Sequence, residues 1–392
     1  RSIVRSRSET KAPDLGVLKR FGPARVRGRL LEFINGCSAN ERTGFLSNWR
    51  RTGCDQLDLT AQPDQYIITV VNNRDDRVSR SQVFARVLVE DIACDRHVLI
   101  GTNTHGLLGY IHTSLDAFLA TQRVVTPEDL SNGTEEGLPA RRLDALLVRL
   151  RVVPRTPEAL AGQLEIFAHG AGRLLPTAAL AEAAERCGRW LADDEATGLG
   201  FAEVHAATLA DLAPWAEEAL AAAPYTGPIE PPEVDAPATS AVAAAHFARQ
   251  VARTVIAARL HARLRAALIA GPGAIEEFHG ELHAAYRELF LELVDVVEDP
   301  LTTGDQVVLR CALAVPPGVN VTLMGTQNIK GTGLDFVYRW IALDAATQDL
   351  TALASADAET RAAALRRLES PDDPGPLDSG REVDAGGQHE EA

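Results

Sequence analysis

Arginines and aspartates directly after an apolar run are the residues of this chain best suited to bind a charged small molecule. The run Tyr66–Val71 (YIITVV) is followed by NNRDDR at positions 72–77. Arg74 and Arg77 offer guanidinium forks that match carboxylates. The aspartates between them could hold an amino group or pair with the arginines. A site for a small zwitterion or carboxylate is therefore predicted, with a purely structural salt-bridge loop as the alternative.

The elements that must position these side chains are strands of a buried sheet. Four apolar runs, each followed by a polar loop and a helical pattern, are Leu30–Asn35, Tyr66–Val71, His97–Gly101 and Val319–Gly325. Their alternation with helical segments predicts an α/β fold, Rossmann-like, with a mostly parallel sheet. Ligands of such sheets bind beyond the carboxyl ends of the strands, which is where residues 72–77 would lie.

Two further strand ends carry polar or glycine-rich sequences. After Asn35 comes GCSANERTG, in which Ser38 or Asn40 would cap a helix whose N-terminus favours an anion; an ordinary turn is the alternative. LIGTNTHG (99–106) and LMGTQNIKGTG (323–333) place glycines after strands. Asn328 and Lys330 could reach a phosphate, whereas a tight turn explains the same glycines.

Several classes of site are disfavoured. Neither glycine-rich segment fits GxGxxG, and the dipeptide Gly-Lys of a P-loop does not occur. His279 and His283 lie four residues apart, but the HExxH order is absent, so no metal site is predicted. The five cysteines are far apart, which indicates reduced thiols rather than disulfides.

Charge and hydrophobicity limit the partners. The net charge is −15, yet residues 1–51 carry +8. Because no aromatic residues interleave with this basic run, nucleic acid is not expected; an acidic substrate or a solvated segment fits better. The chain contains no run of about 18 uncharged apolar residues, so no transmembrane helix is predicted. A cytoplasmic protein is predicted, with a peripheral position at the inner face of the cell membrane left open; an integral membrane role would need a partner subunit.

Composition divides the chain into successive regions. A basic lead-in is followed by an α/β domain in two pieces, which a helical insertion with a Pro-rich extended linker separates, and a helix with an acidic disordered tail ends the chain. The insertion includes long helices at 241–270 and 274–298. The predicted boundaries are 1–29, 30–136 with 313–350, 137–312 with the linker at 225–240, and 351–392.

Together, these motifs resemble one family. FINGCSANERTGFLSNW, ITVVNNRDDRVSRSQVFA, HVLIGT and LMGTQNIKGTG, in this order, look like the C-terminal part of the CapB/PgsB ligase subunit of poly-γ-glutamate synthase, a Mur-ligase relative. The resemblance covers roughly residues 12–110 and 315–342. It implies a Mur-ligase C-terminal-domain type of fold, and an enzyme that uses ATP and Mg²⁺ to join glutamates through an acyl phosphate.

The resemblance also implies roles for residues of this chain. Asn73, Arg74 and Arg77 would contact the incoming glutamate, with Asn35 and Asn40 on the same rim. Glutamate, poly-γ-glutamate and the membrane subunits of a capsule synthase complex would be partners, and a homo-oligomer stays open. ATP would bind mainly to a domain that this sequence does not contain. The chain is thus expected to be a fragment of a longer ligase. One alternative is a non-catalytic module that binds an anion and recruits a partner; a dehydrogenase is a weaker one.

Overall fold

Six strands form one sheet, whose order is β1-β2-β6-β3-β4-β5. The computed structural model describes residues 17–58, 60–132, 137–192, 200–226, 236–355 and 357–369. β1 pairs with β2 in antiparallel fashion, and all other neighbours are parallel. The predicted α/β fold with a mostly parallel sheet is confirmed, and so are the four predicted strands. The strands are β1 (Lys19–Val26), β2 (Arg29–Asn35), β3 (Gln65–Asn73), β4 (Arg96–Gly101), β5 (Val294–Val296) and β6 (Asn320–Thr326).

The sheet extends beyond the predicted α/β pieces on both edges. β1 lies in the basic lead-in, where Gly22 and Pro23 hide the strand pattern. β5 lies in the region predicted to be a helical insertion, and it pairs with β4. The helix predicted over 274–298 is therefore wrong at its end, because α10 (Pro272–Leu291) stops before Val294. A three-residue strand is too short to give a period of its own.

Helices cover both faces of the sheet. On one face, Ile34 of β2 packs in a hydrophobic cluster with Phe45 of α1 (Arg42–Arg51) and Phe84 of α2 (Val78–Arg86). Its neighbour Phe33 points to the other face, because successive strand residues alternate. There its ring contacts Phe336 and Trp340 of α12 (Thr332–Ala352), with ring centroids 4.9 and 5.7 Å from its own.

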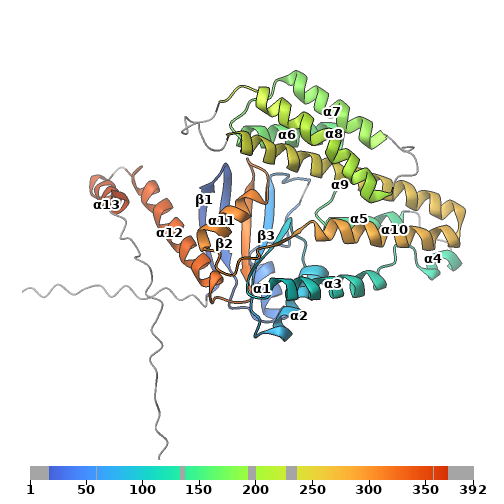
Figure 1. The fold of residues 1–392 in the computed structure, drawn as a ribbon, viewed down its shortest axis with the longest axis horizontal. Coiled ribbons are helices and arrows are strands. Elements are labelled where there is room, and N and C mark those ends of the chain that lie inside the picture. Colours follow the sequence, from blue (N-terminus) through green and yellow to red (C-terminus); the bar gives the residue numbers. More distant parts are fainter. Residues whose placement is uncertain are drawn as a thin grey trace, which may run out of the picture. The chain divides into compact units, whose positions relative to one another are not determined.

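The helical region forms a layer at the amino ends of the strands (Figure 1). Its attachment is tight: a Cβ on Gly170, the last residue of α6, would lie 1.9 Å from the backbone nitrogen of Gly318, just before β6. Only glycine allows these two backbones to approach so closely. The remaining elements are the π-helical turn η1 (Val87–Asp91), α3 (Thr104–Thr121), α4 (Pro127–Asn132), α5 (Leu138–Arg149), α6 (Pro157–Gly170), α7 (Thr177–Ala192), α8 (Phe201–Ala222), α9 (Ala236–Ala270), α11 (Gly304–Leu313) and α12 (Thr332–Ala352).

The Pro-rich linker and the acidic tail fall largely outside the described residues. Of the predicted linker at 225–240, residues 227–235 are not described, whereas 236–240 are helical and begin α9. The extended prediction is wrong there, because a proline in the first turn of a helix is tolerated. A second compact unit, Ala342–Ala392, holds the end of α12 and α13 (Ala358–Glu369), which confirms the predicted last helix. The tail beyond Glu369 lies outside the described residues.

The sequence also led to predictions about the cysteines and about membrane-spanning helices. All five cysteines are buried and free, as expected for reduced thiols. Among the described helices, none has the length and apolar character needed to span a bilayer.

Candidate functional site

The carboxyl ends of the parallel strands meet at one edge of the sheet, and the chain leaves two of them in opposite directions. β3 continues into α2, whose Phe84 packs on the Ile34 side of the sheet. β6, which lies next to β3, continues into α12, whose Phe336 packs on the Phe33 side. Neighbouring strands whose connections diverge to opposite faces leave a crevice, the usual place for a ligand in an open α/β sheet. The residues that follow β3 and β6 line this switch point.

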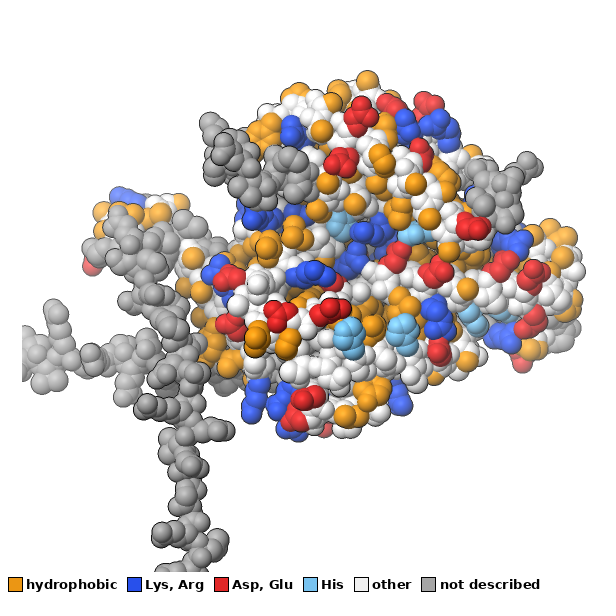
Figure 2. Space-filling model, in the orientation of Figure 1, with side chains coloured by type: hydrophobic (Ala, Val, Ile, Leu, Met, Phe, Trp, Pro, Cys, Tyr) orange, Lys and Arg blue, Asp and Glu red, His pale blue; other side chains and the backbone are white. Residues whose placement is uncertain are grey.

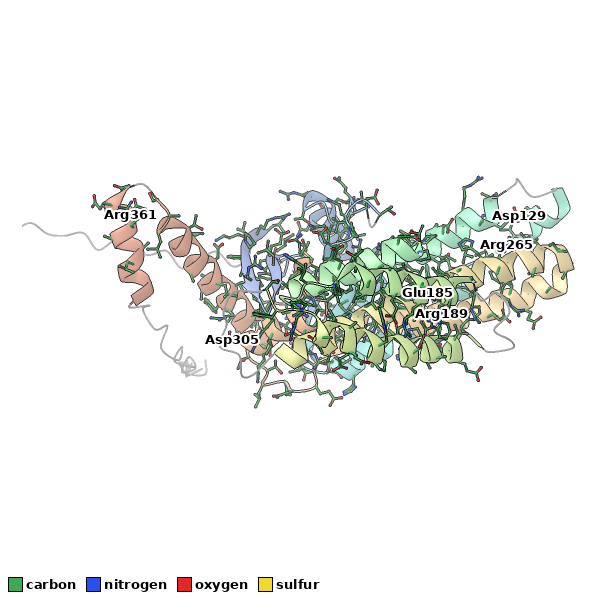
Figure 3. All side chains as sticks on the ribbon, turned by 90° about the horizontal axis from the view of Figure 1, so that it is seen from above. Asp129, Glu185, Arg189, Arg265, Asp305 and Arg361 are labelled. Carbon is green, nitrogen blue, oxygen red and sulfur yellow. The ribbon has the colours of Figure 1, made fainter. Side chains whose placement is uncertain are left out.

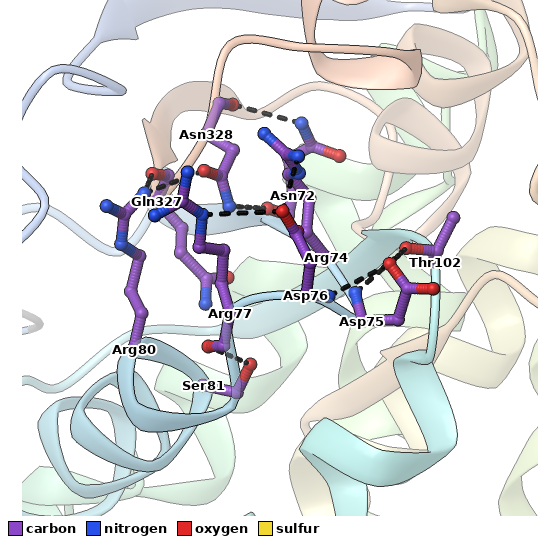
Figure 4. A network of polar contacts seen from close by, with 10 residues as sticks. All are labelled: Asn72, Arg74, Asp75, Asp76, Arg77, Arg80, Ser81, Thr102, Gln327 and Asn328. Carbon is purple, nitrogen blue, oxygen red and sulfur yellow. Dashed lines mark hydrogen bonds and ion pairs between the residues drawn. The ribbon is translucent and has the colours of Figure 1, made fainter.

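Three arginines gather at the switch point, and two of them contact the same carboxylate (Figure 4). Asp76 accepts a hydrogen bond from Arg74 at 2.7 Å and lies 3.6 Å from Nε of Arg77. Arg80 donates to Oδ1 of Asn328 at 2.7 Å. Burial, and then the charges of Arg77 and Arg74, lower the pKa of Arg80. Positive charge at this point therefore exceeds what Asp76 compensates.

The arginines remain open to a ligand. The side chain of Arg77 is 51% exposed and that of Arg74 is 26% exposed. Asp75 turns away from them, since its Oδ1 accepts from the amide of Asp76 at 2.9 Å and from Oγ1 of Thr102 at 3.3 Å. Asp75 thus shapes the loop, while Arg74 and Arg77 present their guanidinium groups at the crevice.

The N-terminus of α2 adds to the positive potential. Arg77 occupies the cap position but its side chain makes no capping hydrogen bond, and the first turn contains no acidic residue. Uncapped amides at a helix N-terminus carry partial positive charge that favours an anion. α1 is similar: its cap residue is Glu41, again without a side-chain bond. The predicted capping of this helix by Ser38 or Asn40 is therefore wrong.

Asn73 is buried beneath the arginines and holds three loops together. Its Nδ2 donates to the carbonyls of Thr102 and Asn103, both at 2.9 Å. Its Oδ1 accepts from the hydroxyl of Ser81 at 2.6 Å and from Nε2 of Gln327 at 3.3 Å. Since both donors and the acceptor of this amide are engaged, the geometry suits Asn73 to positioning the loops of β3, β4 and β6.

The loop after β6 is tied to β3 in the same way. Nδ2 of Asn72 donates to the carbonyls of Asn328 and Lys330, at 3.0 and 2.8 Å. A Cβ on Gly333 would lie 2.2 Å from that Nδ2, so the second glycine of the GTG sequence makes room for the Asn72 amide. The glycine-rich segment therefore serves the packing of this loop.

The switch point also contains a strained backbone position and buried polar atoms without hydrogen-bond partners. Gln327 is fully buried and has φ of +82°, in the left-handed region that costs a non-glycine residue energy. Oε1 of Gln327, Oδ1 of Asn72 and Oγ1 of Thr326 are buried without a hydrogen-bond partner. Strained and unsatisfied groups of this kind concentrate at functional sites.

The structure separates the predicted site residues into two groups. Arg74, Arg77 and Asn328 lie together at the switch point (Figure 4). Asn73 joins them through Ser81 and Gln327, and Lys330 is exposed on the loop after β6. Asn35 ends β2 and Asn40 lies in the loop after it, and β2 is separated from β3 by β6. There Asn35 is buried and its Oδ1 accepts from the amide of Cys37 at 3.3 Å, while Asn40 is exposed.

Two residues of this site were missed by sequence reasoning. Arg80 follows Arg77 by three residues, a spacing that places both on one side of a helix, so this signal was present. Gln327 gave no signal, because its importance depends on a positive φ and on its contact with Asn73.

The histidine pair of α10 serves packing. Nε2 of His279 accepts from the amides of Val124 and Val125 at 3.2 and 3.3 Å, and Nε2 of His283 lies 3.1 Å from the carbonyl of Gln122. Across the described part of the chain, no group of three His, Cys, Asp or Glu side chains could hold a metal ion.

Comparison with known proteins supports the resemblance. Residues 21–170 match the family model described as the poly-gamma-glutamate synthase CapB C-terminal domain. This match runs from β1 to the end of α6 and includes Arg74, Arg77 and Arg80. It associates the chain with poly-γ-glutamate synthesis. The resemblance of residues 315–342 lies outside it and stays a prediction. No curated protein and no solved structure matches the chain.

Proposed function

We propose that the switch point holds the incoming glutamate of an ATP-dependent acid–amino acid ligase that makes poly-γ-glutamate. The observation that supports this proposal most directly is the cluster of Arg74, Arg77 and Arg80, in which Arg74 and Arg77 share the carboxylate of Asp76. Glutamate carries two carboxylates and one ammonium group. Arginine forks bind carboxylates bidentately and fix their orientation.

Arg74 and Arg77 take the carboxylates of glutamate in this proposal, and Asp76 is the group available for its ammonium. Asn73 acts as a positioning residue, because its amide is fully engaged with neighbouring loops. A nucleophile held in a fixed orientation reacts at a much higher effective concentration than a free one. The role of this part of the ligase is then to present the amine of glutamate to an activated carboxyl group.

The loop after β6, which carries the residues predicted to contact a phosphate, does not fit ATP and Mg²⁺. Asn328, the candidate for a phosphate contact, is buried and bonds through its side chain to Arg80 and to the carbonyl of Asn72. Lys330 is exposed, and its carbonyl accepts from Asn72. The space that glycines would offer a phosphate is filled by the Asn72 amide at Gly333. We propose that the nucleotide binds another domain or subunit, so no step of catalysis is assigned to it here.

Calorimetry with glutamate tests the binding role. Arg74→Gln and Arg77→Gln should each weaken glutamate binding at least about tenfold, since hydrogen bonds to charged groups contribute about 1.5–3 kcal/mol. Arg86→Gln is the matched control, because Arg86 is an exposed arginine in the last turn of α2, the helix that begins directly after Arg77. Equal affinities in all three variants would refute the assignment.

A further inference from the structure

A second cluster of arginines surrounds a small cavity at the opposite end of the sheet, where the strands begin. The cavity has a volume of about 30 Å³ and lies between the start of β4, the first half of α9 and the loop before β6. It is lined by Tyr66, Asp95, Arg96, Arg151, His246, Arg249, Gln250, Arg253, Ala314 and Val315. Figure 2 shows basic side chains and histidines along the boundary between the helical layer and the sheet.

The acidic groups near this cavity are already engaged. Asp95 lies 3.2 Å from Nη2 of Arg151 and accepts from the amide of Ile67 at 2.7 Å. Glu292 lies behind the cavity and pairs with His205 at 3.1 Å. Among the described residues, Asp95 is the acid that lines the cavity. Its single charge faces four guanidinium groups.

The guanidinium groups are held in place by backbone carbonyls. Arg96 donates to the carbonyl of Ala314 at 3.1 Å, and Arg253 donates to that of Leu150 at 2.9 Å. Nε of Arg253 is buried without a partner. A carbonyl orients a guanidinium group but does not neutralise its charge. These side chains are therefore preorganised, and the positive charge of the cluster exceeds the charge of the neighbouring carboxylates, which is costly at a half-buried position.

Repulsion within the cluster is visible on α9. Arg249 and Arg253 are one turn apart, where like charges destabilise a helix. Burial, and then the charges of these two arginines, lower the pKa of Arg96 to about 10. Nδ1 of His246 lies 3.3 Å from Nη1 of Arg249. Burial, followed by Arg249 and Arg96, lowers the pKa of His246 well below its usual value.

We propose that this cavity, formed where the α/β sheet meets the helical region, is a binding site for a phosphate dianion. Four arginines line the cavity against the single charge of Asp95. Glu292 and Asp295 lie farther away, and Asp295 is paired with Arg310. A dianion balances this excess of positive charge better than one carboxylate does. The cavity has a volume of only about 30 Å³, so it suits a small free anion such as inorganic phosphate better than a bulky ester. Bound phosphate would link α9 to β4 and to the loop before β6.

Calorimetry on the full chain, at constant ionic strength set with chloride, tests this site. Inorganic phosphate should bind, and Arg249→Gln should weaken the binding at least about tenfold by loss of a charged hydrogen bond. Arg249 suits the test because its described bond is to His246 rather than to a backbone carbonyl. Arg265→Gln is the control: Arg265 is exposed on the same helix, toward the end away from the sheet (Figure 3).

Three outcomes separate this site from the glutamate site. Arg74→Gln should leave phosphate binding unchanged; if it abolishes binding while Arg249→Gln does not, phosphate binds at the switch point and the proposal is wrong. Glycerol 3-phosphate titrated in parallel should bind more weakly than phosphate, and tighter binding would identify an ester as the ligand of the same arginines. In the unsubstituted protein, phosphate should raise the NMR-measured pKa of His246. An unmoved His246 titration would overturn the proposal even if the Arg249 variant fails to fold.

Discussion

The amides of Asn72 and Asn328 bond reciprocally to each other's backbone. Nδ2 of Asn72 donates to the carbonyl of Asn328 at 3.0 Å, and Nδ2 of Asn328 donates to the carbonyl of Asn72 at 3.1 Å. The two residues are 256 positions apart in the chain: Asn72 is the last residue but one of β3, and Asn328 lies just beyond the adjacent strand β6. This pair joins the two loops that present the arginine cluster.

Removing one amide of this pair should destabilise the protein. Asn328→Ala leaves the carbonyl of Asn72 without this donor and removes one of the two acceptors of Arg80, at a largely buried site. The expected loss is about 1–3 kcal/mol, the usual cost of unsatisfied buried polar groups. Urea denaturation measures it. Asn40→Ala, at an exposed asparagine, should stay within about 0.5 kcal/mol of the wild type; similar losses in both variants would contradict the assigned role.

Two glycine-to-alanine substitutions should change the stability of the protein in opposite directions. In Gly333→Ala the new Cβ would lie 2.2 Å from Nδ2 of Asn72, so the loop after β6 must shift and stability must fall. Gly280 lies within α10 and a Cβ there meets nothing within 4 Å. Gly280→Ala should therefore gain up to about 1 kcal/mol from helix propensity. Thermal unfolding of both variants checks the prediction, and a tolerated Gly333→Ala would show that Asn72 does not need this space.

The sequence allowed prediction of the strands whose burial is continuous. β3 and β6 are apolar and β-branched runs, so their type and order were clear. β5 was missed because its three residues follow a long helical pattern, and its strand character comes from pairing with β4. Arg74 and Arg77 were predicted because their context is local. The contact of Arg80 with Asn328 was not, since it depends on β6 inserting beside β3.

Stability should fall as the pH drops below the usual pKa of histidine. His97 is buried against Thr69, Cys94 and Phe290. Burial, and then the charge of Arg96, lower the pKa of His97 to about 3. Between about pH 6.5 and 3 the unfolded chain binds a proton that the folded chain does not, so stability rises with pH in this window and is lost as pH falls.

The free energy of unfolding should change by up to about 1.4 kcal/mol per pH unit for one such histidine. Urea denaturation between pH 8 and pH 5 measures the slope of stability against pH. His97→Gln should reduce that slope, whatever its effect on stability itself. His105→Gln, at a histidine whose side chain is 69% exposed, should leave the slope unchanged. A wild-type slope retained by His97→Gln would mean that other groups carry the pH dependence.

Removing the shared carboxylate should strengthen anion binding at the switch point. Asp76 competes with a ligand carboxylate for Arg74 and Arg77, and Asp76→Asn keeps its size while removing its charge. A simple dicarboxylate that has no ammonium group, such as glutarate, should then bind about three- to tenfold more tightly, a gain of about 0.6–1.4 kcal/mol that is within the range of an exposed ion pair.

Glutamate separates the two roles proposed for Asp76. The affinity for glutamate should rise less than the affinity for glutarate in Asp76→Asn, because the ammonium group of glutamate loses the carboxylate that we propose as its partner. Asp55→Asn, at an exposed aspartate away from the switch point, is the control for the change in net charge. Calorimetry with both ligands on both variants measures the difference. If glutarate bound more weakly to Asp76→Asn, the carboxylate would be needed to hold the arginines in place, and competition with the ligand would be the wrong explanation.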